Sequence, residues 1–214
     1  MFDVLSEDVS GDLSAARSNS VVFTASKRVF DVLVSITLLP ALLILAAGIA
    51  ALNMWLNPGP LIFKQERMGR RCRAFTAYKF RSMQCVSKIE RSANDPVESN
   101  RITKLGQILR RYRIDELPQV INVLKGEMSF VGPRPDYFPH AEEFLRQVPG
   151  YRERHSVRPG ISGLAQTEIG YVQGPAETRR KVMADLYYIR NASFRLEAWI
   201  LWRTLCTVFG RKGV

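Results

Sequence analysis

The sequence predicts a mostly helical α/β fold attached to one face of a membrane, that is, a monotopic membrane protein. Three patterns support this prediction. A long uncharged apolar segment lies near the N-terminus, residues 61–83 alternate between apolar and polar side chains, and much of the remaining chain has apolar residues at helical spacing. We therefore expect a re-entrant membrane helix, a small β-hairpin, and amphipathic helices at the membrane interface.

The length and composition limit the class of protein. With 214 residues, 46% of them hydrophobic, the chain can bury one core but is too short for a many-span transporter. Lys and Arg number 31 against 20 Asp and Glu, and four of the acids lie in residues 1–26. The rest is strongly basic, so we expect an anionic partner: nucleic acid, a phosphate-rich substrate or an acidic membrane. The three cysteines form no Cys-x-x-Cys pair, which argues against a disulfide or zinc scaffold.

The N-terminal part divides into a tail and a membrane segment. Residues 1–26 are rich in Ser, Asp and Ala and are predicted to be a flexible tail rather than a signal peptide. Residues 27–57 are assigned to the membrane, because their apolar stretch can reach across a hydrocarbon core about 30 Å thick. Basic residues flank both ends, which favours the cytoplasmic side for both. Pro40 removes a helical hydrogen bond, so we expect a break there and a re-entrant course; a plain spanning anchor is the alternative.

Residues 58–214 are assigned to a cytosolic domain. Its alternating segment is predicted to form a hairpin that turns at Met68-Gly69. Apolar spacing predicts a helix over 101–113, and a second helix is expected from Asp115 to Lys125, with its two acids at the N-terminal end. Two prolines and a glycine predict a rigid extended loop at 129–135. Further predicted elements are a loop at 86–100, helices at 139–147 and 176–190, a turn at 158–163, and a helix from Phe194 to Phe209 that either lies in the membrane interface or packs on the core.

Asp115 and Glu116 form an acidic pair with arginines close by in the sequence (RRYRIDELPQ), and the GPRP stretch adds Arg134. Two carboxylates beside several guanidinium groups suit a site that holds a divalent cation together with phosphate oxygens. An Asp-Glu pair by itself is more often a solvated helix start. Here the surplus of arginines indicates that a further anion binds.

Six sequence blocks in this order resemble the bacterial sugar transferase family, the monotopic polyprenyl-phosphate phosphoglycosyl transferases. The blocks are KRVFD (27–31), an apolar segment with a proline, YKFRSM (78–83), RRYRIDELPQVINVLKGEMSFVGPRP (110–135), RPGISGLAQ (158–166) and DLYYIRN (185–191). A single block such as GPRP would be a weak signal, whereas six in order are a strong one.

The resemblance implies transfer of a sugar 1-phosphate from a nucleotide diphosphate sugar, first expected to be a UDP-sugar, to undecaprenyl or another polyprenyl phosphate. This reaction would begin exopolysaccharide, O-antigen or other glycoconjugate synthesis at the cytoplasmic face of the bacterial inner membrane. The resemblance also implies Asp115 as the nucleophile of a covalent aspartyl phosphosugar intermediate, Glu116 as its partner, and Mg²⁺ bound at the pair. The residues that it suggests for phosphate binding are Arg110 and Arg134, with Arg158 as a weaker candidate, whereas Arg111 and Arg113 are expected to be solvated. Lys79 and Arg81, which share one face of the predicted strand, are expected either to line the phosphate site or to meet lipid phosphates.

The chain departs from the family pattern in three places. Relatives commonly have a Ser-Pro pair at the membrane break, a few residues farther from the Phe-Asp pair than Pro40 lies from Phe30-Asp31 in this chain. Here the residue before Pro40 is Leu39. Leu164 stands where many relatives have Trp, and a different run follows Gln166, so no sugar is predicted. The chain is also expected to be a minimal form, without the multi-span N-terminal domain of longer relatives.

The competing interpretation is a membrane-tethered basic protein that binds nucleic acid without catalysis. Such a protein would interleave aromatic with basic residues on a stacking surface. In this sequence the basic residues instead cluster around an acidic pair, beside an apolar anchor. We therefore expect an enzyme whose partners are a nucleotide sugar, a polyprenyl phosphate and membrane lipids, with no nucleic acid; the pattern does not indicate an oligomeric state.

Overall fold

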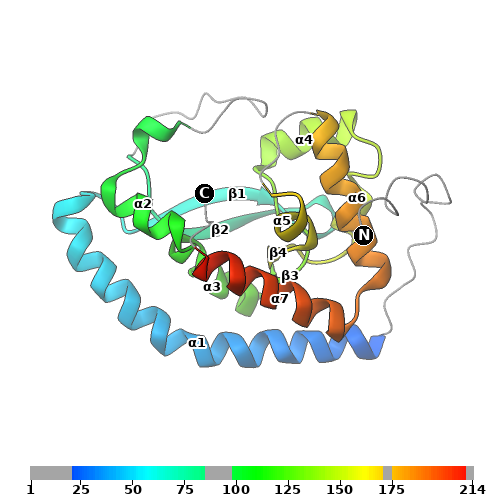
Figure 1. The fold of residues 1–214 in the computed structure, drawn as a ribbon, viewed down its shortest axis with the longest axis horizontal. Coiled ribbons are helices and arrows are strands. Elements are labelled where there is room, and N and C mark those ends of the chain that lie inside the picture. Colours follow the sequence, from blue (N-terminus) through cyan, green and yellow to red (C-terminus); the bar gives the residue numbers. More distant parts are fainter. Residues whose placement is uncertain (1–20, 85–97, 171–174, 211–214) are drawn as a thin grey trace.

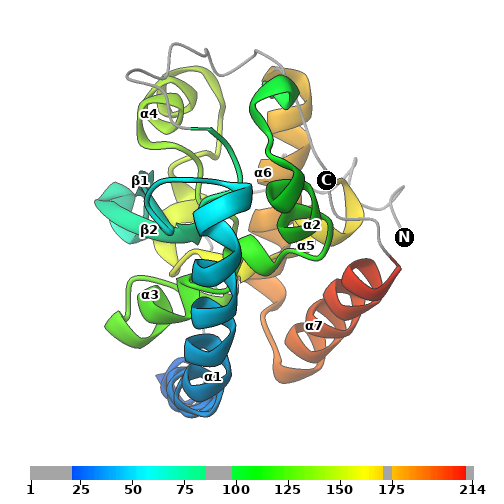
Figure 2. The same ribbon diagram turned by 90° about the vertical axis from the view of Figure 1, so that its left-hand side faces the viewer.

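The computed structural model describes residues 21–84, 98–170 and 175–210. Most of these residues are helical, and the described strands form two separate pairs. Helix α1 (Val21–Leu56) runs along the lower edge of the molecule and the first strand pair crosses its middle (Figure 1). Helix α4 (Phe138–Gln147) lies on the far side from α1, and α6 (Pro175–Asn191) runs from that side down toward α1 (Figure 1). A quarter turn shows α1 and α7 together at the bottom (Figure 2). The predicted tail lies outside the described residues except for 21–26, which are helical, and the loop predicted at 86–100 lies outside them up to residue 97.

Helix α1 (Val21–Leu56) begins six residues before the predicted membrane segment and continues past Pro40. It is bent near its middle, the part of the sequence that Pro40 occupies (Figure 1). Among the described helices it is the one long and apolar enough to cross a membrane, and only 17% of its most apolar stretch is buried. Because a core helix would be mostly buried, this exposure fits a membrane-associated protein.

Both halves of α1 contact the same body of the protein. In the first half, Arg28 donates hydrogen bonds to the carbonyl oxygens of Val123 and Leu124. In the second half, Ile49 packs in the core and the Asn53 side chain donates to the carbonyl of Gly59 at 2.9 Å. The helix therefore lies along the body instead of projecting away from it.

The predicted hairpin is present. Strands β1 (Ile62–Met68) and β2 (Ala74–Phe80) pair antiparallel, with Ile62 opposite Phe80 and Met68 opposite Ala74. The connection is longer than the predicted Met68-Gly69 turn, because a 3-10 turn over Arg70–Cys72 lies between the strands.

The predicted helix from Asp115 to Lys125 is wrong in its first half. Helix α2 (Lys104–Arg111) ends before the acidic pair, and a separate 3-10 turn covers Ile114–Glu116. Helix α3 (Gln119–Lys125) begins after Pro118. Proline suits the start of a helix because it has no N–H to donate to the preceding turn, and Pro118 is the residue that caps the N-terminal end of α3. The acidic pair consequently lies between two helices.

A second pair of strands was not predicted. Strands β3 (Ser129–Val131) and β4 (Gly160–Ser162) pair in parallel. Each has three residues, too few to show the alternation that identifies a strand in a sequence. Because the GPRP residues follow β3 directly, the pairing with β4 holds the start of that loop.

The remaining helices are α4 (Phe138–Gln147), α5 (Leu164–Glu168), α6 (Pro175–Asn191) and α7 (Phe194–Phe209). The first, third and fourth agree with predicted helices, and α5 was missed because it is short. Helix α7 packs on the core, as one of its two predicted descriptions has it, and its place in a membrane interface stays a prediction. Ile200 is completely buried in the core, whereas 65% of the Trp202 surface is exposed.

Two clusters of buried side chains form the core. One joins α4, α6 and α7 to β1 and β3, and it includes Met68, Val131 and Ile200. The other joins the second half of α1 to the hairpin and α2, through Ile49, Phe80 and Leu109. The turn that carries the acidic pair is held between α2 and α3, next to the second cluster.

Candidate active site

Asp115 and Glu116 are buried carboxylates in the turn between α2 and α3. Their exposed fractions are 8% and 6%. The residue before this turn, Arg113, has left-handed backbone angles (φ 54°, ψ 22°), which redirect the chain after α2. Two adjacent acids removed from water require compensating charges or hydrogen bonds.

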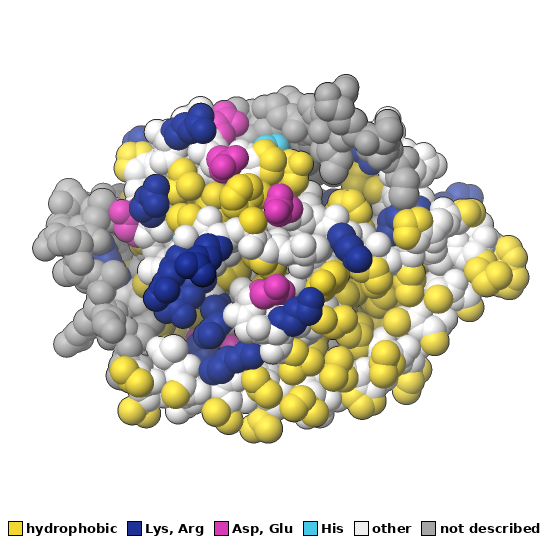
Figure 3. Space-filling model, turned by 180° about the vertical axis from the view of Figure 1, so that it is seen from behind, with side chains coloured by type: hydrophobic (Ala, Val, Ile, Leu, Met, Phe, Trp, Pro, Cys, Tyr) yellow, Lys and Arg dark blue, Asp and Glu magenta, His cyan; other side chains and the backbone are white. Residues whose placement is uncertain are grey.

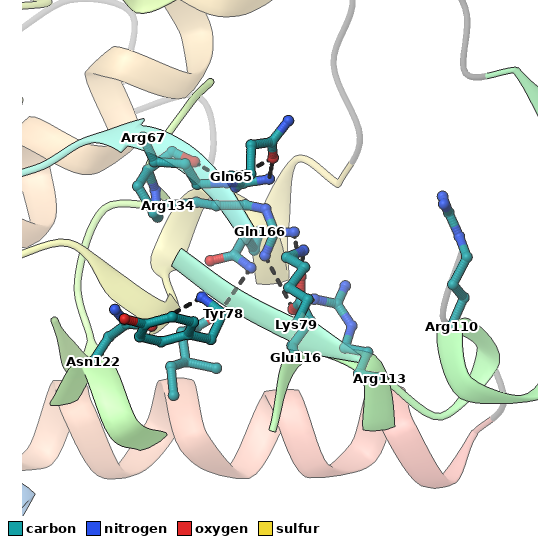
Figure 4. A network of polar contacts seen from close by, with 12 residues as sticks. Gln65, Arg67, Tyr78, Lys79, Arg110, Arg113, Glu116, Asn122, Arg134 and Gln166 are labelled. Atoms are coloured by element: carbon teal, nitrogen blue, oxygen red, sulfur yellow. Dashed lines mark hydrogen bonds and ion pairs between the residues drawn. The ribbon is translucent and has the colours of Figure 1, made fainter. Parts of the chain in front are cut away.

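Glu116 is surrounded by cations (Figure 4). Lys79 Nζ on β2 lies 2.6 Å from Oε1, and Arg134 in the GPRP loop donates to Oε1 at 2.5 Å and to Oε2 at 3.1 Å. Arg113 Nη1 is 3.8 Å from Oε2. Burial alone would raise the pKa of Glu116, but the positive charges of Arg134 and Lys79 outweigh it and hold this pKa well below its usual range. Glu116 is therefore ionised, with both oxygens occupied.

Asp115 is in a different state. In the described part of the chain its carboxylate accepts no hydrogen bond and forms no ion pair. Burial raises its pKa, the neighbouring Glu116 raises it further, and the charges of Lys79, Arg134 and Arg110 act in the opposite direction. The pair is thus asymmetric: one carboxylate is tied to the protein, and the other is available to a ligand.

Buried hydrogen bonds hold the loop that carries Arg134. Arg154, whose side chain is fully buried, donates to the Arg134 carbonyl at 2.8 Å and forms ion pairs with Asp136 at 2.5 Å and Asp185 at 2.7 Å. From the hairpin, Arg67 donates to the Pro135 carbonyl at 2.7 Å. Arg154 and Arg67 were not predicted to take part in the site, because their partners are backbone atoms and acids distant in the sequence.

The residues predicted to bind phosphate fall into three groups. Lys79 and Arg134 meet at Glu116. Arg110 lies apart from this network on α2, with Nη1 3.7 Å from the Met83 sulfur (Figure 4). Its charge still lowers the pKa of Asp115, so it is within electrostatic reach of the pair. Arg158 is not brought to the pair: its Nε donates to the Gly126 carbonyl, and it lines a separate cavity with Arg28.

The two arginines expected to be solvated behave differently. Arg111 is exposed, as predicted. Arg113 is only partly exposed and approaches Glu116, so that expectation is wrong for it. The α2 helix ends before Arg113, and the left-handed turn then directs this residue toward the pair, which helical spacing could not indicate.

Gln166, in the RPGISGLAQ block, was not predicted to have a role in the site. Its Nε2 donates a hydrogen bond to the Ile161 carbonyl at 3.2 Å, and it is drawn with the network around Glu116 (Figure 4). Its Oε1 atom is buried and has no hydrogen-bond partner in the described part of the chain. A polar ligand at the site would supply one.

The carboxylate pair is compatible with Mg²⁺, although the described residues include no cluster of three potential metal-binding side chains. Magnesium is commonly bound by one or two carboxylates together with substrate phosphates and water. The available oxygens of Asp115 meet this requirement. Glu116 could bind the ion only by exchanging one of its contacts with Lys79 or Arg134.

Comparison with known proteins agrees with the resemblance. A family model described as bacterial sugar transferase matches residues 22–211. The chain is 41% identical over 195 residues to the UDP-N-acetylgalactosamine-undecaprenyl-phosphate N-acetylgalactosaminephosphotransferase of Aeromonas hydrophila, covering 91% of this chain and 46% of that protein. It is 41% identical over 198 residues to the exopolysaccharide production protein PSS of Rhizobium leguminosarum bv. phaseoli, covering 87% of this chain and 97% of that protein.

A third relative is the UDP-glucose:undecaprenyl-phosphate glucose-1-phosphate transferase of Caulobacter vibrioides. It is 40% identical over 184 residues, covering 84% of this chain and 65% of that protein. The chain thus spans about half to two thirds of two of these relatives and nearly all of the Rhizobium protein. Relatives of almost equal identity are named for different sugars, so overall similarity does not select one.

Proposed function

The chain belongs to the bacterial sugar transferase family, and from this premise we propose that it is a phosphoglycosyl transferase that moves a sugar 1-phosphate from a UDP-sugar to undecaprenyl phosphate. The products would be undecaprenyl diphosphate sugar and UMP. Such a lipid-linked sugar begins the synthesis of an exopolysaccharide or a related glycoconjugate. The names of the Aeromonas and Caulobacter relatives support the donor and acceptor classes.

The observation that carries the proposal is the division of roles within the acidic pair. Glu116 is ionised and held by Lys79 and Arg134, whereas Asp115 has no protein partner among the described residues. A nucleophile must be free to approach a phosphorus atom. A carboxylate that already accepts several charge-assisted hydrogen bonds would first have to give them up.

The proposed reaction has two displacements at the same phosphorus. An Asp115 oxygen attacks the sugar-bearing phosphorus of the donor, and the bond from this phosphorus to the bridging oxygen breaks and releases UMP. The enzyme then carries the sugar phosphate as an acyl phosphate on Asp115. An oxygen of undecaprenyl phosphate attacks that phosphorus, the bond to Asp115 breaks, and the carboxylate is restored.

The cations around the pair would stabilise this chemistry. Each displacement brings negatively charged oxygens together, so positive charge fixed beforehand near the phosphorus lowers the barrier. Arg134 and Lys79 are placed by Glu116, and Arg110 would approach the phosphates from α2. Asp115 would be the residue that holds Mg²⁺, and the ion would supply positive charge that neutralises part of the phosphate charge.

The membrane arrangement is also a proposal: α1 enters and leaves by the cytoplasmic face of the inner membrane. The bend near Pro40 and the contacts of both halves of α1 with one body support it. A spanning helix would place Lys27 and Arg28 across the bilayer, yet Lys27 pairs with Glu197 at 2.5 Å and Arg28 bonds to the end of α3. Basic residues flanking both ends favour the cytoplasmic side.

The test compares neutral variants of the two acids. Asp115→Asn should abolish turnover because an amide cannot form the acyl phosphate. Glu116→Gln should keep the nucleophile but lose the charge that places Lys79 and Arg134, so turnover should fall strongly without vanishing. The exposed Glu142→Gln on α4 is the control. Turnover is measured as UMP released from a panel of UDP-sugars with undecaprenyl phosphate and Mg²⁺.

A second measurement detects the intermediate directly. Incubation with donor alone should add the mass of a sugar phosphate to the wild type and to Glu142→Gln, with the adduct on the Asp115 peptide. Asp115→Asn should gain no mass. Near-normal turnover of Asp115→Asn would show that the nucleophile is wrongly assigned.

A further inference from the structure

A basic cavity lies against the first half of α1 and shares no lining residue with the Asp115–Glu116 site. Its volume is about 280 Å³, and its walls come from α1, the hairpin connection, β3, the residues before β4, and α6. Four basic side chains line it: Lys27, Arg28, Arg70 and Arg158. This is where the structure places Arg158, which was expected at the carboxylate pair.

The cavity carries more positive than negative charge. The charge of Lys27 is balanced by Glu197 at 2.5 Å. Asp31 is the one acid among the lining residues, and one of its oxygens accepts a hydrogen bond from the Phe130 amide at 3.2 Å. Three guanidinium groups therefore face a single carboxylate. Burial lowers the pKa of the Arg158 guanidinium, and the charges of Arg28 and Arg70 lower it further, which reflects this crowding.

Two of the guanidinium groups are fixed by the backbone near the end of α3. Arg28 donates to the carbonyls of Val123 and Leu124, and Arg158 Nε donates at 2.8 Å to the carbonyl of Gly126, which caps the helix. These neutral carbonyls hold the side chains in place without removing their positive charge. The cations are therefore arranged before any ligand arrives, which reduces the entropy lost on binding.

An unsatisfied hydroxyl group points to a ligand at the same place. Ser129 lines the cavity, is 1% exposed, and its Oγ has no hydrogen-bond partner in the described part of the chain. Buried polar groups nearly always have a partner, so one without is a sign of a missing molecule. A hydroxyl donor beside guanidinium groups suits a phosphate oxygen.

The cavity lies next to the apolar surface that faces the proposed membrane. Phe23 lines it and contacts the ring of Phe194 on α7, with ring centroids 5.0 Å apart. Nearby on α1, Val29 and Phe30 are 59% and 46% exposed. From behind, Lys and Arg side chains gather above the apolar side chains that cover the lower edge, where α1 lies (Figure 3). A phosphate held at such a border can keep acyl chains attached to it within the bilayer.

We propose that this cavity binds the phosphate of an anionic phospholipid headgroup, at a site separate from the one where the sugar phosphate is transferred. Arg158, Arg70 and Ser129 would contact the phosphate oxygens. The acyl chains would lie along the exposed side of α1. The bound lipid would fix the depth and the orientation of the body at the membrane.

The test measures lipid binding by native mass spectrometry of the full chain in a nonionic detergent without phosphate. Phosphatidylglycerol is the probe, and glycerol 1-phosphate is the soluble analogue of its headgroup. The wild type should retain one phosphatidylglycerol. Arg158→Gln should weaken this binding at least tenfold, and Ser129→Ala about threefold, because each removes a hydrogen bond to the phosphate.

Arg195→Gln is the matched control, because Arg195 is an exposed arginine next to Phe194. Its lipid binding should stay close to that of the wild type. Equal losses in Arg158→Gln and Arg195→Gln would mean general attraction to lipid and would overturn the proposal. So would wild-type binding by both Arg158→Gln and Ser129→Ala. If Arg158→Gln fails to fold, Ser129→Ala decides, since it removes only one oxygen atom.

Two further arms separate the proposal from its alternatives. If glycerol 1-phosphate binds as tightly as phosphatidylglycerol, the cavity is a site for soluble phosphates and the lipid assignment is wrong. Asp115→Asn should retain the lipid as the wild type does. Failure of the proposed catalytic mechanism would therefore leave this result unchanged, and failure of the lipid site would leave the turnover test unchanged.

Discussion

Replacement of Arg134 by alanine provides a quantitative test of the site, because this side chain makes two hydrogen bonds to a buried carboxylate. Each charge-assisted bond contributes roughly 1.5–3 kcal/mol, and breaking a fully buried pair costs about 3–5 kcal/mol. The Arg134 side chain is 25% exposed and Lys79 remains 2.6 Å from Glu116, so water and Lys79 offset part of this cost. We expect Arg134→Ala to lower the free energy of unfolding by about 2 kcal/mol, which corresponds to a fall in Tm of roughly 6 °C.

The loss should depend on pH in a defined direction. A carboxyl group whose pKa is lowered by folding contributes stability above its unfolded-state pKa, about 4.3 for glutamate, and loses this contribution as the pH falls through its folded-state pKa. Because the pKa of Glu116 is lowered, the difference between wild type and Arg134→Ala should be complete at pH 7 and smaller at pH 3. Turnover at pH 7 should fall by about two to three orders of magnitude.

The assay is thermal and urea unfolding of the detergent-solubilised protein, followed by circular dichroism. Arg111→Ala on the exposed side of α2 is the control and should change the unfolding free energy by less than about 0.5 kcal/mol. The double variant Glu116→Gln with Arg134→Ala should be less destabilised than the sum of the two single variants, because both single variants disrupt the same Arg134–Glu116 contact and the double variant loses it only once. Equal stability of Arg134→Ala and Arg111→Ala at pH 7 would refute the role assigned to the contact with Glu116.

Three further predictions concern Lys79, the metal and the membrane helix. Burial lowers the pKa of Lys79 to about 8 even though the charge of Glu116 raises it, so kcat/KM for the donor should fall above about pH 8. Lys79→Arg should move this fall to higher pH, because arginine keeps its charge. An unchanged pH profile would exclude Lys79 as the source of the fall. EDTA should abolish turnover and Mg²⁺ should restore it, whereas full activity in EDTA would exclude the metal. In a variant without native cysteines, Ser20→Cys and Glu66→Cys should both react with an impermeant maleimide only from the cytoplasm; labelling of Ser20→Cys from outside would favour a spanning helix. Pro40→Leu should shift part of the population toward spanning and lower turnover with it.

Local patterns in the sequence were sufficient for the features that depend on neighbouring residues. The uncharged apolar run from Val32 to Phe63 indicated a long membrane-associated helix, and alternation around Met68-Gly69 indicated the hairpin. The order of six blocks was sufficient for the family. Local patterns failed where one residue changed the course of the backbone. Pro118 ended the assumed continuity between Asp115 and Lys125, and the left-handed Arg113 turned toward the carboxylates.

The sequence by itself determined which residue types could form the site. The tertiary structure alone decided which of the cations contact which carboxylate. Adjacent Asp115 and Glu116 look equivalent in the sequence, but only Glu116 meets Lys79 from β2 and Arg134 from the loop after β3. Likewise, Arg134 and Arg158 both precede a proline, yet the pairing of β3 with β4 places one at the carboxylates and the other against α1. Periodicity reports contacts within one element. Ion pairs between residues 18 or 37 positions apart depend on how separate elements pack, and this packing decides which charges meet.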